Sequence, residues 1–73
     1  MSETTIDEDR VAALDDAGLS PQQARVQVLI EQGLTHREIA DRLSLKRGTV
    51  NSHADRIRQK ADRSRTLLAL LDD

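Results

Sequence analysis

Two segments of the sequence have the pattern of a helix start. Residues 20–23 read Ser-Pro-Gln-Gln, which offers a serine cap, a proline at the first helical position and a glutamine at the reciprocal place of a capping box. Residues 35–38 read Thr-His-Arg-Glu and have the pattern of a second capping box. Gly18 and Gly33 each stand where a helix can exit into the left-handed conformation. These start and stop signals predict short helices joined by tight turns, and therefore an all-α fold.

The start and stop signals and the spacing of the apolar residues together predict five helices. The first is capped by Asp7 and extends to about residue 17, and its apolar face is thin. The expected ranges of the others are 21–32, 36–43, 47–61 and 64–71, with a tight turn at 44–46. We therefore expect a small bundle of four core helices with an additional short N-terminal helix.

The core of this bundle has to be built from aliphatic side chains, because the 73 residues include no Phe, Tyr, Trp or Cys. Apolar residues at i, i+3 and i+4 share one face of a helix. The residues expected to be buried on this basis are Val11, Leu14, Val26, Leu29, Ile30, Ile39, Ala40, Leu43, Val50, His53 or Ala54, Ile57 and Ala61. In the turn, Leu45 is the apolar residue expected where two helices meet at an angle. A chain of this length holds one domain, which its core stabilises by roughly 3–5 kcal/mol.

The formal net charge of −2 hides an uneven distribution along the chain. Residues 1–19 carry six acids and one base, residues 20–71 carry ten bases and five acids, and the last two residues are both Asp. The chain therefore has an acidic leader, a basic middle and an acidic tip. For a nucleic-acid partner the distribution of charge matters more than its sum, so the overall acidity does not exclude DNA.

Other classes of protein lack their signatures in this sequence. The two histidines are 17 positions apart without a Cys nearby, so we expect no metal site. No nucleophile–base–acid set and no Gly-rich phosphate loop is visible, so we expect neither an enzyme nor a bound cofactor. No apolar run approaches the roughly 20 residues of a membrane span, and the N-terminus lacks the pattern of a signal peptide. We therefore expect a cytoplasmic protein without a membrane partner.

The segment 36–61 has the pattern of a helix-turn-helix unit. A short helix, a tight turn and a longer helix with a polar, basic outer face allow the second helix to enter the major groove of double-stranded DNA. The two helix starts can supply amide N–H groups, hydroxyls and positive side chains to phosphates. The candidate phosphate contacts are Thr35, His36, Arg37, Lys46, Arg47, Thr49 and Arg56.

The chain also resembles a known family of DNA-binding domains. Residues 19–21 read Leu-Ser-Pro, residues 33–40 contain Gly-Leu-Thr followed by Glu-Ile-Ala, and residues 48–53 contain Gly-Thr-Val and Ser-His. In this combination and at this spacing, the stretch from Leu19 to Ile57 is similar to the LuxR-type (GerE-type) helix-turn-helix domain. The resemblance implies a four-helix fold, DNA binding, and a domain over residues 19–73 that follows the leader at 1–18.

The resemblance implies roles for individual residues. Its base-reading positions in the recognition helix fall on Asn51, Ser52 and Asp55. Its last helix, the usual dimerisation element, falls on residues 64–71. The candidate residues of a dimer interface are Leu67, Leu68 and Leu71.

Several departures from the family pattern bear on function. Lys46 stands where a capping Ser is usual, so the recognition helix loses a cap and gains a positive charge. Asn51 and Asp55 stand where basic residues are common, and Gln27 replaces a usual Leu. Asp55 could accept from a cytosine amino group, pair with a neighbouring arginine, or repel phosphate. The link at 60–66 is one residue shorter than usual, so the last helix could dock differently.

Two functions are open at this point. The first is a sequence-specific transcriptional regulator that binds DNA as a homodimer and reads the major groove with helix 47–61. The second is a protein–protein interaction module, or partner of another regulator, that uses the Leu-rich last helix without binding DNA. The acidic leader admits three interpretations: a solvated tail, a segment that folds over the basic face and competes with DNA, and an extension of a dimer interface.

Overall fold

The computed structural model describes residues 6–71 and contains five α-helices and no strand within that range. The helices are α1 (Glu8–Asp16), α2 (Pro21–Glu31), α3 (His36–Leu43), α4 (Arg47–Arg63) and α5 (Arg65–Leu71). The predicted all-α class and the order of the helices are confirmed. The main difference is that α4 continues past its predicted end at Ala61, as far as Arg63. None of the described helices has the length and apolar character needed to cross a membrane.

Local hydrogen bonds set the helix boundaries. The Asp7 carboxylate accepts two backbone N–H groups at the start of α1. The predicted capping boxes at residues 20–23 and 35–38 are both present. The glycines that follow α1 and α2 have positive φ, 123° at Gly18 and 91° at Gly33, which a residue with a side chain rarely adopts. The predicted helix starts and exits are therefore confirmed in their physical detail.

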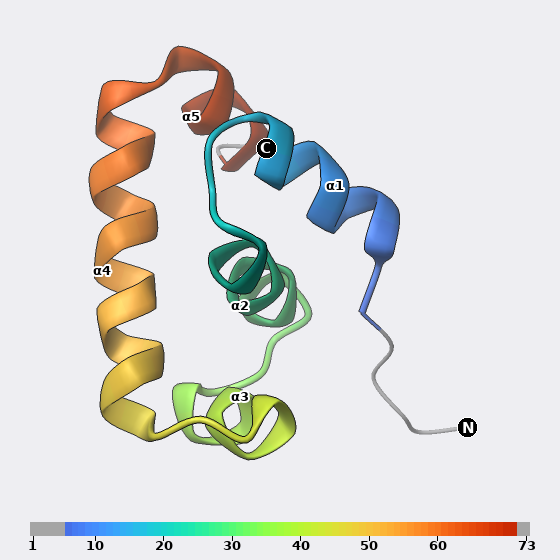
Figure 1. The fold of residues 1–73 in the computed structure, drawn as a ribbon, viewed down its shortest axis with the longest axis vertical. Coiled ribbons are helices and arrows are strands. Elements are labelled where there is room, and N and C mark those ends of the chain that lie inside the picture. The colour runs from blue at the N-terminus through green and yellow to red at the C-terminus, as the bar shows by residue number, and fades with distance from the viewer. Residues whose placement is uncertain (1–5, 72–73) are drawn as a thin grey trace.

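The long helix α4 forms one side of the molecule (Figure 1). α3 packs near its N-terminal end and α5 near its C-terminal end, while α2 packs against α1, α3 and α4. Between α4 and α5 lies only Ser64, which has an extended backbone. The Ser64 hydroxyl accepts the N–H of Leu67 at 3.2 Å, so this residue ends one helix and caps the next. The short link thereby turns α5 back onto the bundle.

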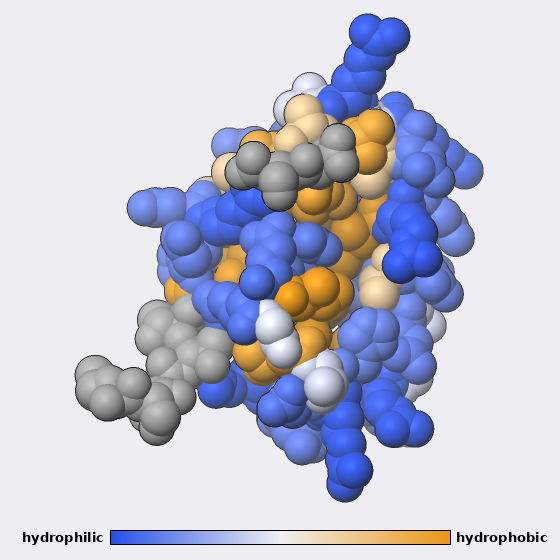
Figure 2. All heavy atoms as spheres, turned by 180° about the vertical axis from the view of Figure 1, so that it is seen from behind, coloured by the Kyte–Doolittle hydropathy of each residue, from blue (hydrophilic) through white to orange (hydrophobic). Residues whose placement is uncertain are grey.

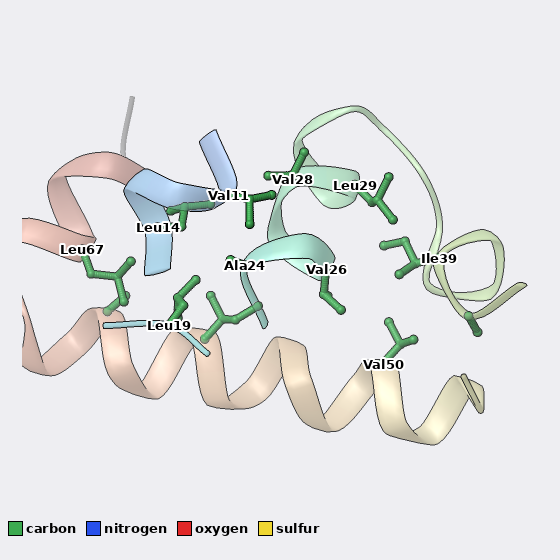
Figure 3. Packing of buried hydrophobic residues seen from close by; sticks show 13 residues of the cluster. Val11, Leu14, Leu19, Ala24, Val26, Val28, Leu29, Ile39, Val50 and Leu67 are labelled. Carbon is green, nitrogen blue, oxygen red and sulfur yellow. The ribbon is translucent and has the colours of Figure 1, made fainter. Parts of the chain in front are cut away.

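The core extends from α1 at one end of the bundle to α3 at the other (Figure 3). Leu14 and Leu67 lie in its first part, near α1 and α5. Leu29, Ile39 and Val50 lie in its second part and join α2, α3 and α4. All five side chains are 0% exposed, and full burial of such a side chain stabilises a fold by about 1.5–3 kcal/mol. The second part of the core holds α3 and α4 in their relative orientation.

Some residues predicted to be buried lie at the margin of the core instead. Those that are only half-buried are Ile30, Leu43, His53 and Ala54. A bundle of short helices has little interior, so the outer positions of each apolar stripe stay partly open to solvent.

α1 belongs to the same core as the rest of the chain. Val11 is 7% exposed and Leu14 has no exposed surface. Arg10 ties α1 to two other helices, because its guanidinium pairs with the Glu31 carboxylate at 2.9 Å and also donates to the carbonyl of Leu70. The interpretation of the leader as a solvated tail is therefore wrong for residues 6–18, whereas its other two interpretations stay predictions.

A buried polar contact connects the C-terminal half of α4 to α2. Gln23 is 5% exposed, and its side-chain oxygen accepts from the N–H of Ser20 at 3.1 Å and from the Lys60 ammonium at 2.8 Å. Lys60 also donates to the carbonyl of Gly18 at 3.2 Å. Because a buried polar group without a partner is costly, these bonds fix α4 against the turn between α1 and α2.

Candidate nucleic-acid interface

The turn between α3 and α4 decides how the second helix projects from the first. Ser44 has φ 56° and ψ 43°, and among the described residues it is the one non-glycine with positive φ. The N–H of Leu45 donates to the carbonyl of Ala40 at 2.8 Å, which is the bond of a Schellman motif that spans six residues of the chain. Leu45 is half-buried against the core, as predicted for an apolar residue where two helices meet at an angle. The turn thus anchors the start of α4 from its buried side.

The start of α4 has no side-chain cap. Lys46 occupies the cap position without a capping hydrogen bond, so the predicted loss of the cap is confirmed. The N–H of Val50 donates to the Lys46 carbonyl at 3.1 Å, and the amides of residues 47–49 precede this first intrahelical bond. Lys46 and Arg47 are exposed, Thr49 is half-buried, and the first turn contains no acid. Unpaired N–H groups, the positive end of the helix dipole and two cations together favour an anion.

The start of α3 differs from the start of α4 because it carries a negative charge, on Glu38. The Glu38 carboxylate accepts the N–H of Thr35 at 2.8 Å, and the Thr35 hydroxyl accepts the N–H of Glu38 at 3.1 Å. Hydrogen bonds from the backbone and then the hydroxyl of Thr35 lower the pKa of Glu38, so they favour the charged carboxylate. Thr35, His36 and Arg37 are all exposed. A phosphate that approaches this helix start meets the carboxylate, so the start of α4 is the better anion site.

The predicted base-reading residues lie on the surface of α4. Asn51, Ser52 and Asp55 are exposed, and so is Arg56. The side-chain oxygen of Asn51 lies 2.6 Å from Nδ1 of His36, on α3. The two residues are 15 positions apart, and sequence reasoning assigned them to different tasks. The structure therefore joins a predicted base contact to a predicted phosphate contact.

A groove of about 480 Å³ runs between α2, α4 and α5, and His36 of α3 also lines it. Its apolar lining consists of Ile30, Ala54, Ile57, Ala61, Leu68 and Leu71. The charged side chains that line it come from α4: Asp55, Arg58 and Asp62. On the face shown in Figure 2, apolar side chains gather in a strip that is flanked by hydrophilic ones. Sequence reasoning missed the groove because side chains from four helices line it, and the sequence of no single helix indicates it.

The three leucines predicted to form a dimer interface have different environments. Leu67 has no exposed surface and belongs to the core of the protomer, so in this fold it has no surface to offer a second copy. Leu68 is 47% exposed and lines the groove together with Leu71, which is half-buried. A helix that packs on a bundle turns one side inward, and the apolar run of α5 does not reveal which. The predicted interface now rests on Leu68 and Leu71.

His53 follows the predicted interior position only in part. Its side chain is half-buried, and Nδ1 is inaccessible to solvent without a hydrogen-bond partner among the described residues. Within residues 6–71, no cluster of His, Cys, Asp and Glu is large enough to hold a metal ion.

The fold and the surface of α4 define a helix-turn-helix domain, in which α3 braces a longer helix with a basic start and a polar outer face. A family model described as "Bacterial regulatory proteins, luxR family" matches residues 17–69. The chain therefore belongs to the LuxR family of bacterial regulatory proteins, and the predicted resemblance is confirmed. No curated protein and no solved structure matches the chain. The family match begins after the last residue of α1, so α1 lies outside it.

Proposed function

We propose that this protein is a sequence-specific transcriptional regulator that reads the major groove of double-stranded DNA with the N-terminal half of α4. The observation that carries the proposal is the uncapped, positively charged start of α4, directly beside three exposed polar residues in a domain of a DNA-binding family. The major groove is wide enough to admit an α-helix. Because the proposed partner is bacterial chromosomal DNA, we place the protein in the cytoplasm.

Phosphate contacts position α4 in the groove. Lys46 and Arg47 supply positive charge at the start of the helix, and the Thr49 hydroxyl and the first amides supply donors. Arg37 on α3 and Arg56 on α4 are exposed and extend the positive surface on either side. Each neutralised phosphate contributes a slope of about −0.9 to the logarithmic dependence of affinity on salt.

Base contacts supply the sequence preference. Asn51 can pair with adenine, Ser52 is small enough for a close approach to a base edge, and Asp55 can accept from the amino group of cytosine. Asp55 also borders the apolar groove, one helical turn beyond Asn51. A good bidentate pair discriminates against a wrong base by about 1–3 kcal/mol. Specificity thus rests on a few polar contacts, while the positive helix start supplies affinity.

The protein is further proposed to bind as a homodimer through α5. Leu68, which is 47% exposed, and Leu71 offer apolar surface at the edge of the groove. Exposed apolar surface of this kind is typical of an association site. A two-fold axis at α5 would present the two α4 helices to half-sites about 10–10.5 base pairs apart, or a multiple of that spacing.

Equilibrium binding to duplexes selected from a random pool tests the DNA-binding proposal. Arg47→Ala is expected to weaken binding to all duplexes and to reduce the slope of the salt dependence by about 1. Arg65→Ala, which makes the same change at the exposed start of α5, is the matched control and should leave both quantities unchanged. A pool from which the native chain retains no duplex contradicts the proposal.

The dimer has a separate test in the sedimentation of the free protein. Leu68→Asp puts a charge on the proposed contact and is expected to yield a monomer at concentrations where the native chain is a dimer. Ala69→Asp, a change at an exposed neighbour outside the groove lining, is the control. A native chain that stays monomeric at high concentration removes the homodimer from the proposal.

A further inference from the structure

One hydrogen bond crosses from α3 to the reading face of α4. Nδ1 of His36 lies 2.6 Å from the side-chain oxygen of Asn51. Both side chains are exposed and both line the apolar groove, near the basic start of α4. Because Asn51 contributes its oxygen, which can only accept, His36 donates through Nδ1–H.

In this structure the carboxamide oxygen faces His36, an orientation that the side chain alone leaves open. The last torsion of an asparagine has a broad, roughly two-fold preference, so an unpaired carboxamide presents its oxygen or its nitrogen with similar ease. With the oxygen held by His36, the nitrogen of Asn51 has a defined place on the surface. A carboxamide oxygen has two lone pairs, so one of them is still available to a base.

The donors and acceptors on the base edges determine which base fits the Asn51 carboxamide when His36 holds its oxygen. In the major groove adenine offers an amino donor beside the N7 acceptor, whereas guanine offers two acceptors. A fixed oxygen and a fixed N–H complement adenine, and the fixed oxygen faces an acceptor on guanine. We propose that His36 is a specificity-determining positioning residue, which holds the Asn51 carboxamide in the orientation that reads adenine. This role rests on the proposed function, because it requires Asn51 to meet a base.

The same bond changes the task of His36 itself. A neutral imidazole that donates through Nδ1 has only an acceptor at Nε2. A phosphate oxygen is also an acceptor, so a neutral ring in this state has no hydrogen bond to give it. The neighbouring Arg37, exposed and always charged, is the phosphate contact at this helix start. His36 therefore acts on the choice of base, and Arg37 on general affinity.

Binding measurements on single-base variants of the selected duplex separate these two roles. His36→Leu removes the donor, and His36→Asn restores an N–H near the place of Nδ1. We expect His36→Leu to reduce discrimination between adenine and guanine at one position on the order of tenfold, with little change on a scrambled duplex. His36→Asn should recover much of that discrimination. Arg37→Ala is the control, because it should weaken binding to every duplex without altering the preference.

A double-mutant comparison shows whether His36 works through Asn51. Asn51→Ala should lose the preference at the same base pair, and adding His36→Leu to it should cause no further loss. If His36→Leu weakens all duplexes equally, as Arg37→Ala does, His36 is a phosphate contact and the positioning role is overturned, while the proposed function stands. If the native chain binds no duplex, both are overturned.

The free protein allows a second test that needs no DNA. The chemical shifts of the ring nitrogens, recorded on the neutral ring, report which nitrogen carries the proton. We expect the proton on Nδ1 of His36 in the native chain and a smaller Nδ1–H population in Asn51→Ala. A proton that resides on Nε2 in the native chain, or a distribution that Asn51→Ala leaves unchanged, overturns the positioning role.

Discussion

Leu14→Ala is the perturbation that best tests whether α1 is part of the folded domain. Leu14 has no exposed surface, and it lies in the part of the core that also contains Leu67 of α5 (Figure 3). The substitution keeps a helix-forming residue in α1 and leaves the Asp7 cap untouched. Its effect on stability is therefore an effect of packing between α1 and the helices that follow.

The expected loss is large in relation to the stability of the chain. A fully buried leucine that is cut back to alanine costs about 2.7–5 kcal/mol, depending on how far the cavity collapses. A domain of 73 residues is stable by about 4–11 kcal/mol at typical values per residue, and a small core without disulfides supplies less, roughly 3–5 kcal/mol. We expect a loss of about 3 kcal/mol, which leaves a substantial fraction of the protein unfolded at room temperature.

Urea unfolding followed by circular dichroism measures this loss, since the chain has no Trp or Tyr for fluorescence. Leu68→Ala, compared at a protein concentration at which the chain is monomeric so that the proposed dimer contact does not contribute, is the matched control, because it makes the same chemical change at a residue that is 47% exposed. It should cost less than about 1 kcal/mol. A Leu14→Ala protein that loses no more than the control, with an unchanged dependence on urea, would falsify the packing of α1 in the core. The acidic leader would then be separable from the DNA-binding domain.

Three further predictions concern residues that hold the interface in place. Ser44→Gly removes the left-handed strain of the turn before α4, which costs a non-glycine residue roughly 1–2 kcal/mol, so thermal unfolding should show stabilisation of up to about 1 kcal/mol after the greater chain entropy of glycine. Lys60→Met removes the donor to the buried capping box of α2 and keeps the apolar stem, so urea unfolding should show a loss of about 1–3 kcal/mol. Partial burial raises the pKa of Glu31, but the hydrogen bonds from Arg10 and Gln27 and the charge of Arg10 outweigh it and hold the pKa below its ordinary value. The charged carboxylate therefore adds stability above the ordinary glutamate pKa, and this stability is lost as the pH falls through the lower folded pKa. Glu31→Gln should remove that loss in acid unfolding, with a change of less than about 1 kcal/mol at neutral pH because the pair is partly solvated.

Each of these predictions has an outcome that contradicts it. Ser52→Gly, in the right-handed interior of α4, should destabilise by about 0.5–1 kcal/mol, and a Ser44→Gly protein that behaves in the same way argues against the strained turn. Lys46→Met makes the change of Lys60→Met at an exposed residue with no capping bond, so equal losses would mean that the Lys60 contacts contribute nothing. An acid unfolding profile that Glu31→Gln does not alter is incompatible with the lowered pKa.

Local structure was predictable because its causes are local. The caps at Asp7, Ser20 and Thr35 bond to amides within three residues, and the glycines after α1 and α2 adopt backbone angles that other residues avoid. The end of α4 was predicted less well, because neither glycine nor proline marks it. A side-chain bond at Ser64 starts the next helix there, and its signal in the sequence is weak.

Tertiary structure alone decided which leucine of α5 is buried and whether α1 joins the core. Leu67 and Leu68 are consecutive in the sequence of α5. Because α5 packs against the bundle with one side only, Leu67 is buried and Leu68 stays exposed. The thin apolar face of α1 becomes part of the core because the other helices offer Leu14 a place to pack. Packing energy depends on what surrounds a side chain, and a periodic pattern does not contain that information.

The candidate DNA interface likewise has features that the sequence predicts and features that depend on how the helices pack. The sequence by itself determined the helix-turn-helix unit and the residues on the outer face of α4, because helical periodicity places residues 51, 52 and 55 together. It could not determine that His36 meets Asn51, because that contact depends on the angle between α3 and α4. The turn at Ser44 and the buried contacts of Ile39 and Val50 decide this angle. A helix carries its own hydrogen-bond pattern, whereas a contact between helices exists only once the core has packed.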